Sequence, residues 1–147
     1  MEQNAQPVFA IEKLYIKDFS LEVPNAPAIF LERDTPEVGL QLQTGALKVG
    51  DDIFEVTLTS TVTAKLGEKV VFLVEVAQAG LFVIRNVPEE NLEPLLAIAC
   101  PNILFPYVRE VVSESVTRAG FAPVVLQPVN FEAMYAARVQ QEQTAEA

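Results

Sequence analysis

The residue types that most often carry out chemistry are scarce in this chain. It has no histidine and one cysteine, Cys100, which excludes Ser-His-Asp and Cys-His arrangements, histidine metal sites and cysteine zinc sites. The adjacent acids Asp51 and Asp52 could bind a metal, but such pairs are typical of solvated turns. Cys100 precedes a predicted helix whose N-terminus could lower the thiol pKa, yet no base lies near it in the sequence, which favours an ordinary buried cysteine. There is no Gly-rich phosphate loop either, so we predict no enzymatic activity, no metal and no cofactor.

The composition points instead to binding. The chain has 147 residues, which suits one domain, and its 20 acidic and 10 basic residues give a formal charge of −10. This charge disfavours nucleic acid and anionic membranes as partners. Half of the residues are hydrophobic, and so much apolar surface in a highly charged chain favours association with other proteins. A tightly packed monomer core is the alternative.

Three features predict a cytoplasmic protein. A single cysteine cannot form an internal disulfide and fits a reducing compartment. The first ten residues lack the basic and long apolar segments of a signal peptide. The longest uncharged stretch, residues 94–108, contains three prolines and is shorter than the roughly 18 residues of a membrane span, so direct membrane insertion is not expected.

Four segments have the alternating or β-branched composition of strands and predict an antiparallel sheet. They cover residues 8–19, 37–44, 53–66 and 70–84. The first of them is apolar on both faces, with Phe9, Ile11 and Tyr15 alternating with Leu14 and Ile16.

Glycines and prolines predict how these strands are connected. Turns are expected at 48–52 and at Gly67, and an extended, non-helical crossover at 22–30, where Pro24 and Pro27 disfavour a helix. Gly80 is expected to mark a bulge or bend in the last strand.

The second half of the chain is predicted to be helical. Acidic residues at 89–93 ahead of Pro94 are typical of a helix N-terminus. Pro101 is expected to open a second helix over 101–119, bent at Pro106. This second helix is apolar over more than one stripe, so we expect one side to pack on the sheet and the other on a partner subunit. Its apolar residues are Ile103, Leu104, Phe105, Val108, Val111, Val112 and Val116.

A last helix follows an apolar loop with two prolines at 121–131. Asn130 is expected to cap this helix, and its apolar stripe is Phe131, Met134, Tyr135 and Val139. The polar end of the chain is expected to be disordered.

Two surfaces could bind partners. On the last strand, alternation predicts that Leu73 and Glu75 point to solvent near Asp18 and Glu22, so a hydrophobe among carboxylates could dock a basic partner. An ordinary solvated sheet face is the alternative, and composition alone favours it. The second surface is a possible apolar groove for extended chains, with plain core packing as its alternative. Its candidate residues are Val38, Leu40, Leu42, Phe121, Val125, Leu126, Met134, Tyr135 and Val139.

Specific segments resemble the SecB family of bacterial protein-export chaperones. They are YIKDFSLEVPNAP (15–27), DDIFEVTLTSTVTAKLGE (51–68), CPNILFPYVRE (100–110) and PVNFEAMY (128–135). The resemblance spans residues 8–141 as one domain, between flexible tails at 1–7 and 142–147. It implies an α+β subunit, with a four-stranded antiparallel sheet that has a long helix and a C-terminal helix on one side, assembled as a dimer of dimers.

The resemblance also implies a function. The chain would be an ATP-independent holdase that binds unfolded secretory precursors in hydrophobic grooves and delivers them to the SecA motor of the Sec translocon. The family's SecA-binding positions match Asp18, Glu22, Leu73 and Glu75. The residues of the second surface would line the client groove, and the homotetramer interface would use Ile103, Leu104, Phe105, Val108, Val111 and Val112. A SecB-like chaperone dedicated to another client, such as an antitoxin, is the alternative.

Overall fold

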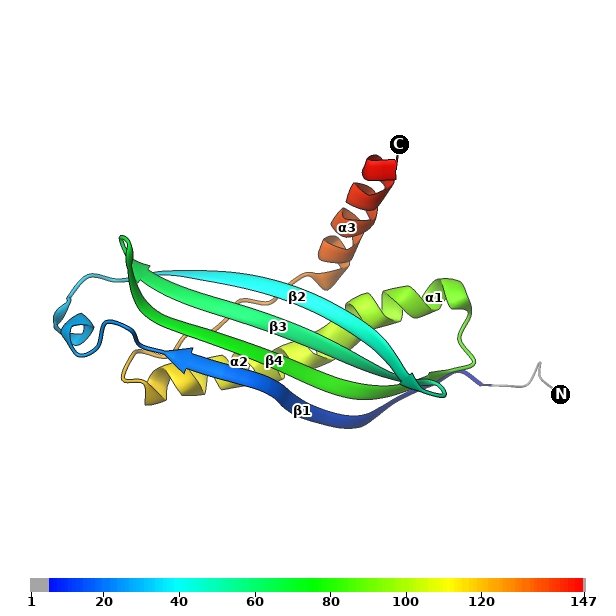
Figure 1. Ribbon diagram of the computed structural model, residues 1–147. Helices are drawn as coiled ribbons and strands as arrows, with labels where there is room; N and C mark the ends of the chain where they lie inside the picture. Colours follow the sequence, from blue (N-terminus) through cyan, green and yellow to red (C-terminus); the bar gives the residue numbers. More distant parts are fainter. Residues whose placement is uncertain (1–5, 147) are drawn as a thin grey trace.

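A single antiparallel sheet with one long helix across it organises this chain (Figure 1). The structure, a computed structural model, describes residues 6–146. The sheet has the order β1-β4-β3-β2: β2, β3 and β4 follow one another through short turns, and the crossover after β1 leaves β1 paired with β4 at the far edge from β2. The elements are β1 (Val8–Glu22), η2 (Ala28–Leu31), β2 (Glu37–Gly50), β3 (Ile53–Leu66), β4 (Lys69–Arg85), α1 (Glu89–Pro94), η3 (Leu95–Ala99), α2 (Cys100–Arg118) and α3 (Phe131–Glu146).

The two central strands bury one face, as their alternation predicts. Val56, Leu58 and Val62 of β3 are fully buried, whereas the threonines between them are only half-buried. On β4, Val74 and Val76 are fully buried towards the helix, and Leu73 and Glu75 lie on the opposite face. We call the helix-covered side the inner face and the other side the outer face.

Two β-bulges explain why the first strand looked apolar on both faces. The β1–β4 register skips Glu12 and then Lys17, and each extra residue switches which parity of position points inward. The inward side chains are therefore odd-numbered, then even-numbered, then odd-numbered again along the strand. They are Phe9, Ile11, Leu14, Ile16, Phe19 and Leu21, which pair with inner-face positions of β4.

The prediction of a bulge at Gly80 was wrong. Gly80 pairs regularly with Leu14, and a Cβ at this position would lie 2.9 Å from Leu14 Cδ2 and 2.9 Å from Phe82 Cε2. Glycine is therefore needed because side chains approach the backbone closely, not because the strand is irregular. The turn predicted at Gly67 is confirmed, with a left-handed φ of +62° at that residue.

The helical region is continuous, contrary to the predicted break before Pro101. Residues Glu89–Arg118 form one helix of 30 residues, with a π-helical turn at Leu95–Ala99 in which the Cys100 amide donates to the Leu95 carbonyl. Pro101 has no amide to donate to the carbonyl four residues earlier. The wider turn just before it accommodates the proline without ending the helix. By length and hydropathy alone this helix could cross a membrane, but it packs along the sheet as the core helix.

Within this chain, the helix α2 buries the face that was predicted to pack on the sheet. Leu104, Val108, Val112 and Val116 are fully buried against the inner face of the sheet. Pro106, Tyr107, Glu110 and Glu114, on the other side, are exposed.

The crossover between β1 and β2 also differs from its prediction. Residues Ala28–Leu31 form a 3₁₀ turn rather than an extended segment. This turn places Phe30 against Phe121, with ring centroids 5.0 Å apart, and Phe121 also contacts Phe72 of β4 at 5.3 Å. Aromatic stacking thus ties the crossover to the segment that follows α2.

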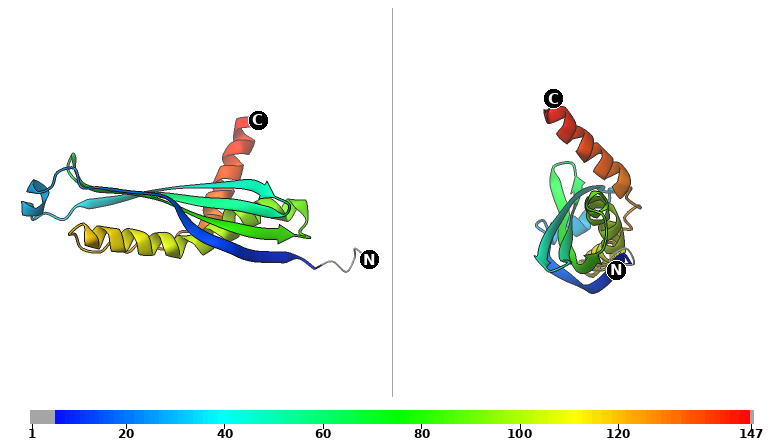
Figure 2. Two further views of the ribbon diagram at one scale, coloured as in Figure 1. Left: turned by 60° about the horizontal axis from the view of Figure 1, so that its bottom comes forward. Right: turned by 90° about the vertical axis from the view of Figure 1, so that its right-hand side faces the viewer.

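The C-terminal helix α3 is attached mainly at its first turn. The predicted cap is confirmed, because the Asn130 side-chain oxygen accepts a hydrogen bond from the Ala133 amide at 2.9 Å. Phe131 is buried edge-on against Phe105. Beyond this anchor α3 projects away from the sheet (Figure 2). It continues to Glu146, where a flexible tail was expected from residue 142; residues 1–5 and 147 of the predicted tails lie outside the described part of the chain.

Candidate docking and client-binding surfaces

The register of β1 and β4 brings the four predicted docking residues together. Glu22 lies directly opposite Leu73, and Ser20 lies opposite Glu75. Asp18 lies opposite Ala77, the next outer-face position of β4. Directly opposed residues share a face of the sheet, so Asp18, Glu22, Leu73 and Glu75 form one cluster on the outer face, which we call the acidic patch.

The acidic patch has the charge and exposure of a docking surface. Its three carboxylates are exposed and Leu73 is half-buried. Among the described residues, no Lys or Arg lies within ion-pair distance of Asp18, Glu22 or Glu75. A cationic partner would therefore meet carboxylates that no neighbouring side chain neutralises.

A polar cluster lies beside the acidic patch and was not predicted. Lys17 Nζ donates to Glu55 Oε1 at 2.8 Å, and the Tyr15 hydroxyl donates to the other oxygen of the same carboxylate. These hydrogen bonds hold the Glu55 pKa below its ordinary value, the Lys17 bond having the larger effect. Burial and the Glu55 carboxylate raise the Tyr15 pKa to about 12. Tyr15 and Lys17 could not be paired with Glu55 from sequence, because the bulge at Lys17 decides which face each residue occupies.

Only part of the predicted client groove forms one concave surface. Leu42, Met134 and Tyr135 line an open cavity of about 430 Å³ between β2, η3 and α3. Phe131 and Arg138 complete its α3 wall, and the Arg138 guanidinium lies 5.3 Å from the centre of the Tyr135 ring. The pairing of a strand with a Met- and Tyr-bearing helix suits extended apolar segments.

The other predicted groove residues lie elsewhere. Val38 and Leu40 line a separate recess farther along β2. Phe121 stacks in the aromatic cluster and Leu126 is buried in the core. Val125 is 67% exposed beside the solvent-facing side of α2. A half-buried Val139 lies one turn beyond Tyr135 on α3. A sequence pattern cannot separate these environments, because the loop after α2 folds back along that helix, where Arg109 Nε donates to the Leu126 carbonyl at 3.2 Å.

Four of the six predicted oligomer-interface residues are already buried within this chain. Leu104, Phe105, Val108 and Val112 face the sheet, so their surface is occupied by their own subunit. Only Ile103 and Val111 remain half-buried.

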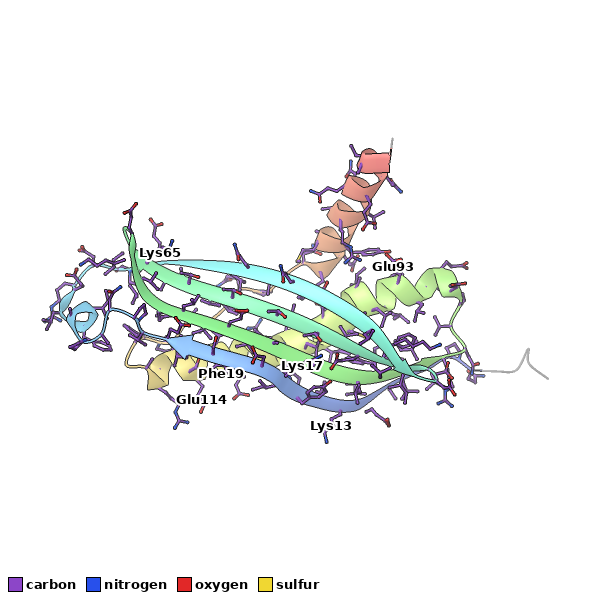
Figure 3. The ribbon with its side chains drawn as sticks, viewed as in Figure 1. Lys13, Lys17, Phe19, Lys65, Glu93 and Glu114 are labelled. Atoms are coloured by element: carbon purple, nitrogen blue, oxygen red, sulfur yellow. The ribbon has the colours of Figure 1, made fainter. Side chains whose placement is uncertain are left out.

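One apolar surface that this chain leaves open lies between β1 and α2. A trough of about 520 Å³ lies between the two elements, lined by Phe19 of β1 and Glu114 of α2, both of which are labelled in Figure 3. Phe19 is 42% exposed, Ile16 49% and Tyr107 44%. We call this surface the β1–α2 trough, defined by Leu14, Ile16, Phe19, Tyr107 and Val111.

The residues considered for chemistry do not form a site. Cys100 is fully buried, and burial raises its thiol pKa to about 12, opposite to the lowering that a helix N-terminus could cause. Asp52 lies in the β2–β3 turn with a φ of 59° and its carboxylate 3.8 Å from Arg85. Within residues 6–146, no three His, Cys, Asp or Glu side chains are grouped as a metal site would need.

Comparisons with known proteins agree with this geometry. A family model described as preprotein translocase subunit SecB matches residues 2–142. The chain belongs to the SecB family. The protein-export protein SecB of Dechloromonas aromatica (strain RCB) is 69% identical over 147 residues, covering 100% of this chain and 97% of that protein. That of Azoarcus sp. (strain BH72) is 65% identical over 146 residues, covering 99% and 94%.

A solved SecB-like structure supports the fold. The SecB-like chaperone of Mycobacterium tuberculosis, solved with a ChAD peptide from an antitoxin, superposes with a TM-score of 0.68 at 19% identity, covering 83% of this chain and 91% of that one. The α+β fold of the SecB family is thus confirmed. As a SecB-family member the chain is a protein-export chaperone of the Sec pathway and not an enzyme.

Proposed function

We propose that this SecB-family chain is a holdase for unfolded secretory precursors and hands them to the SecA motor of the Sec translocon. The observation that supports this most strongly is the acidic patch. Four residues from two strands meet on the outer face, away from the apolar cavity between β2 and α3. Because the two surfaces are separate, one chain can hold a client and dock on a motor at the same time.

Client binding would follow from apolar burial. The cavity beside Leu42, Met134 and Tyr135 offers a site for apolar side chains of an extended chain. Each Leu- or Phe-sized side chain that leaves water contributes roughly 1.5–3 kcal/mol. A folded protein hides such side chains, so we expect only non-native precursors to bind.

A homotetramer, as a dimer of dimers, would strengthen this weak binding. We propose that a second copy covers the β1–α2 trough. Of the predicted interface residues, Ile103 and Val111 remain accessible to this copy. The buried residues Leu104, Phe105, Val108 and Val112 would support the interface from within the subunit. Several cavities on one assembly then act on one client, and the effective concentration of neighbouring sites raises the overall affinity.

The acidic patch would dock SecA through opposite charge. Its carboxylates would attract a basic segment over a distance limited by the Debye length, about 8 Å at physiological salt. Leu73 would add an apolar contact at the centre. We place the complex in the cytoplasm, without membrane insertion and without nucleic acid as a partner.

One experiment tests the holdase function and the assembly. Light scattering after size-exclusion chromatography would give the mass of the protein alone and with an unfolded secretory precursor. A tetramer that binds the unfolded precursor and not its folded form is the expected result. A monomer that binds neither would overturn the proposal.

A SecB-like chaperone with another dedicated client is the second candidate. The M. tuberculosis relative, in complex with an antitoxin peptide, shares the fold of this chain. The acidic patch discriminates between the two functions, because a chaperone dedicated to another client need not bind SecA at all.

A further inference from the structure

Lys17 is placed at the edge of the acidic patch by its β-bulge. It is the extra residue between the pairs Ile16–Gln78 and Asp18–Ala77, so it directly precedes the first carboxylate of the patch. Its side chain is 52% exposed and reaches Glu55 of β3, two strands away. The intervening outer-face residues of β4, Ala77 and Ala79, are small enough to leave this path open.

The surroundings of Glu55 favour the binding of one ammonium group by its carboxylate. Its side chain is 12% exposed, and its two oxygens accept hydrogen bonds from Lys17 and Tyr15. The hydroxyl fixes the carboxylate, so the second oxygen stays directed at the ammonium. A free Lys17 would carry an unneutralised positive charge on the face that has to attract a basic partner.

We propose that Glu55 is a positioning residue for the acidic patch: it binds the Lys17 ammonium and so keeps this positive charge away from Asp18, Glu22 and Glu75. The inference rests on the proposed function, since it concerns how the acidic patch recognises a cationic segment. Tyr15 supports Glu55 from the other side. Without Glu55, the ammonium would repel a cationic partner or pair with the patch carboxylates themselves, and either effect weakens docking.

Two charge-neutralising substitutions test this proposal, because they are expected to change the affinity for SecA in opposite directions. Glu55→Gln leaves Lys17 free, and we expect the affinity for SecA to fall about threefold at about 0.15 M salt, the scale of one exposed charge interaction. Lys17→Gln leaves an additional carboxylate, and we expect the affinity to rise by about the same factor. The double variant Lys17→Gln/Glu55→Gln should bind like the wild type, and both shifts should shrink at high salt.

Lys13→Gln is the matched control. Lys13 lies on the same strand and outer face, opposite Leu81, and Figure 3 shows it nearer the N-terminal end of β1 than Lys17, and so farther from the acidic patch. Its removal changes the net charge equally, so an affinity close to that of the wild type is expected.

The outcomes distinguish failure of the Glu55 proposal from failure of the docking function of the acidic patch. A fall in affinity in both single variants and in the double variant would show that the cluster only supports the sheet, and would overturn the inference. An equal rise in affinity for Lys13→Gln would show a net-charge effect and would also overturn it. If the wild type binds neither SecA nor a lysine-rich peptide, the docking function itself fails and the inference fails with it.

Discussion

Glu22 of β1 lies directly opposite Leu73 of β4 on the outer face of the sheet. Their pairing sets an exposed carboxylate beside a half-buried leucine at the end of the first strand. Glu75 lies two residues along β4 from Leu73, on the same face and opposite Ser20. The acidic patch therefore results from the strand register. The charge of a single patch side chain can be reversed without changing the packing of the core.

Reversing one patch charge should remove motor docking. Glu75→Lys places a cation among carboxylates, and Leu73→Arg does so at the apolar centre, so we expect SecA affinity to fall at least about tenfold in each. Holding of an unfolded precursor should be unchanged, because its surfaces lie elsewhere. Isothermal titration calorimetry with SecA measures the first effect, and suppression of precursor aggregation measures the second. Retention of SecA binding by both variants would contradict the assignment.

Ser60 should be dispensable for stability. Its hydroxyl is fully buried on the inner face of β3, between Leu42 and Val76 in the ladder, and has no hydrogen-bond partner among the described residues. A buried unpaired hydroxyl costs free energy. We expect Ser60→Ala to raise the free energy of unfolding by up to about 1 kcal/mol, as measured by urea denaturation. A loss of several kcal/mol would show that the hydroxyl has a partner in solution.

Much of the sheet could be predicted from sequence, and the first strand shows what could not. Alternation placed Val74, Val76 and Glu75 on their correct faces, because β4 pairs regularly over that stretch. Alternation failed on β1, where two bulges change the phase. A bulge depends on pairing with another strand, so the sequence of β1 alone carries no direct signal for it.

The helical half shows a second limit. Proline rules predicted a helix start at Pro101, whereas a π-helical turn lets the helix continue through it. The apolar surface around α2 was correctly recognised, but most of it faces the chain's own sheet. The β1–α2 trough was missed, because it combines residues of two elements whose packing the sequence does not give.

Removal of the Glu55 carboxylate should have a pH-dependent effect on stability. Its folded-state pKa is lowered by Lys17 and Tyr15, so the ionised form stabilises the folded state. This contribution is fully present above the unfolded-state pKa of about 4.3 and is lost as the pH falls through the lower folded-state pKa. We therefore expect the difference in unfolding free energy between the wild type and Glu55→Gln to be constant near neutral pH and to shrink in acid.

Tyr15→Phe tests the other member of the same hydrogen bond, whose contribution to stability should change at high pH. The Tyr15 pKa is raised from 10.0 to about 12, so its neutral hydroxyl stabilises the fold below pH 10 and this contribution is lost as the pH rises through about 12. Urea denaturation of the wild type and both variants, in the acid range and in the alkaline range, checks the two expected pH dependences. A Glu55→Gln effect that grows as the pH falls would contradict the lowered pKa.

Loss of the Asn130 cap should loosen α3. The side-chain oxygen of Asn130 satisfies the Ala133 amide, and most of α3 beyond Phe131 is exposed, so little other packing holds the helix. We expect Asn130→Ala to cost about 1 kcal/mol of local stability, seen as faster amide exchange across α3 with unchanged exchange in β3 and β4. Asn130→Asp, which retains the capping oxygen, is the control and should exchange like the wild type.

Charge in the β1–α2 trough should prevent assembly. Phe19 is 42% exposed on the inner side of the edge strand β1, so Phe19→Glu would bury a carboxylate if a second copy covered the trough, at a cost that association does not repay. Light scattering should then report a smaller species than for the wild type, with circular dichroism unchanged because Phe19 is not in the core. Leu47→Glu is the control, since Leu47 is 61% exposed on β2, and its mass should match the wild type. If Phe19→Glu keeps the wild-type mass, the trough is not the subunit interface, and Ile103 and Val111 would have to meet the partner through another face of α2.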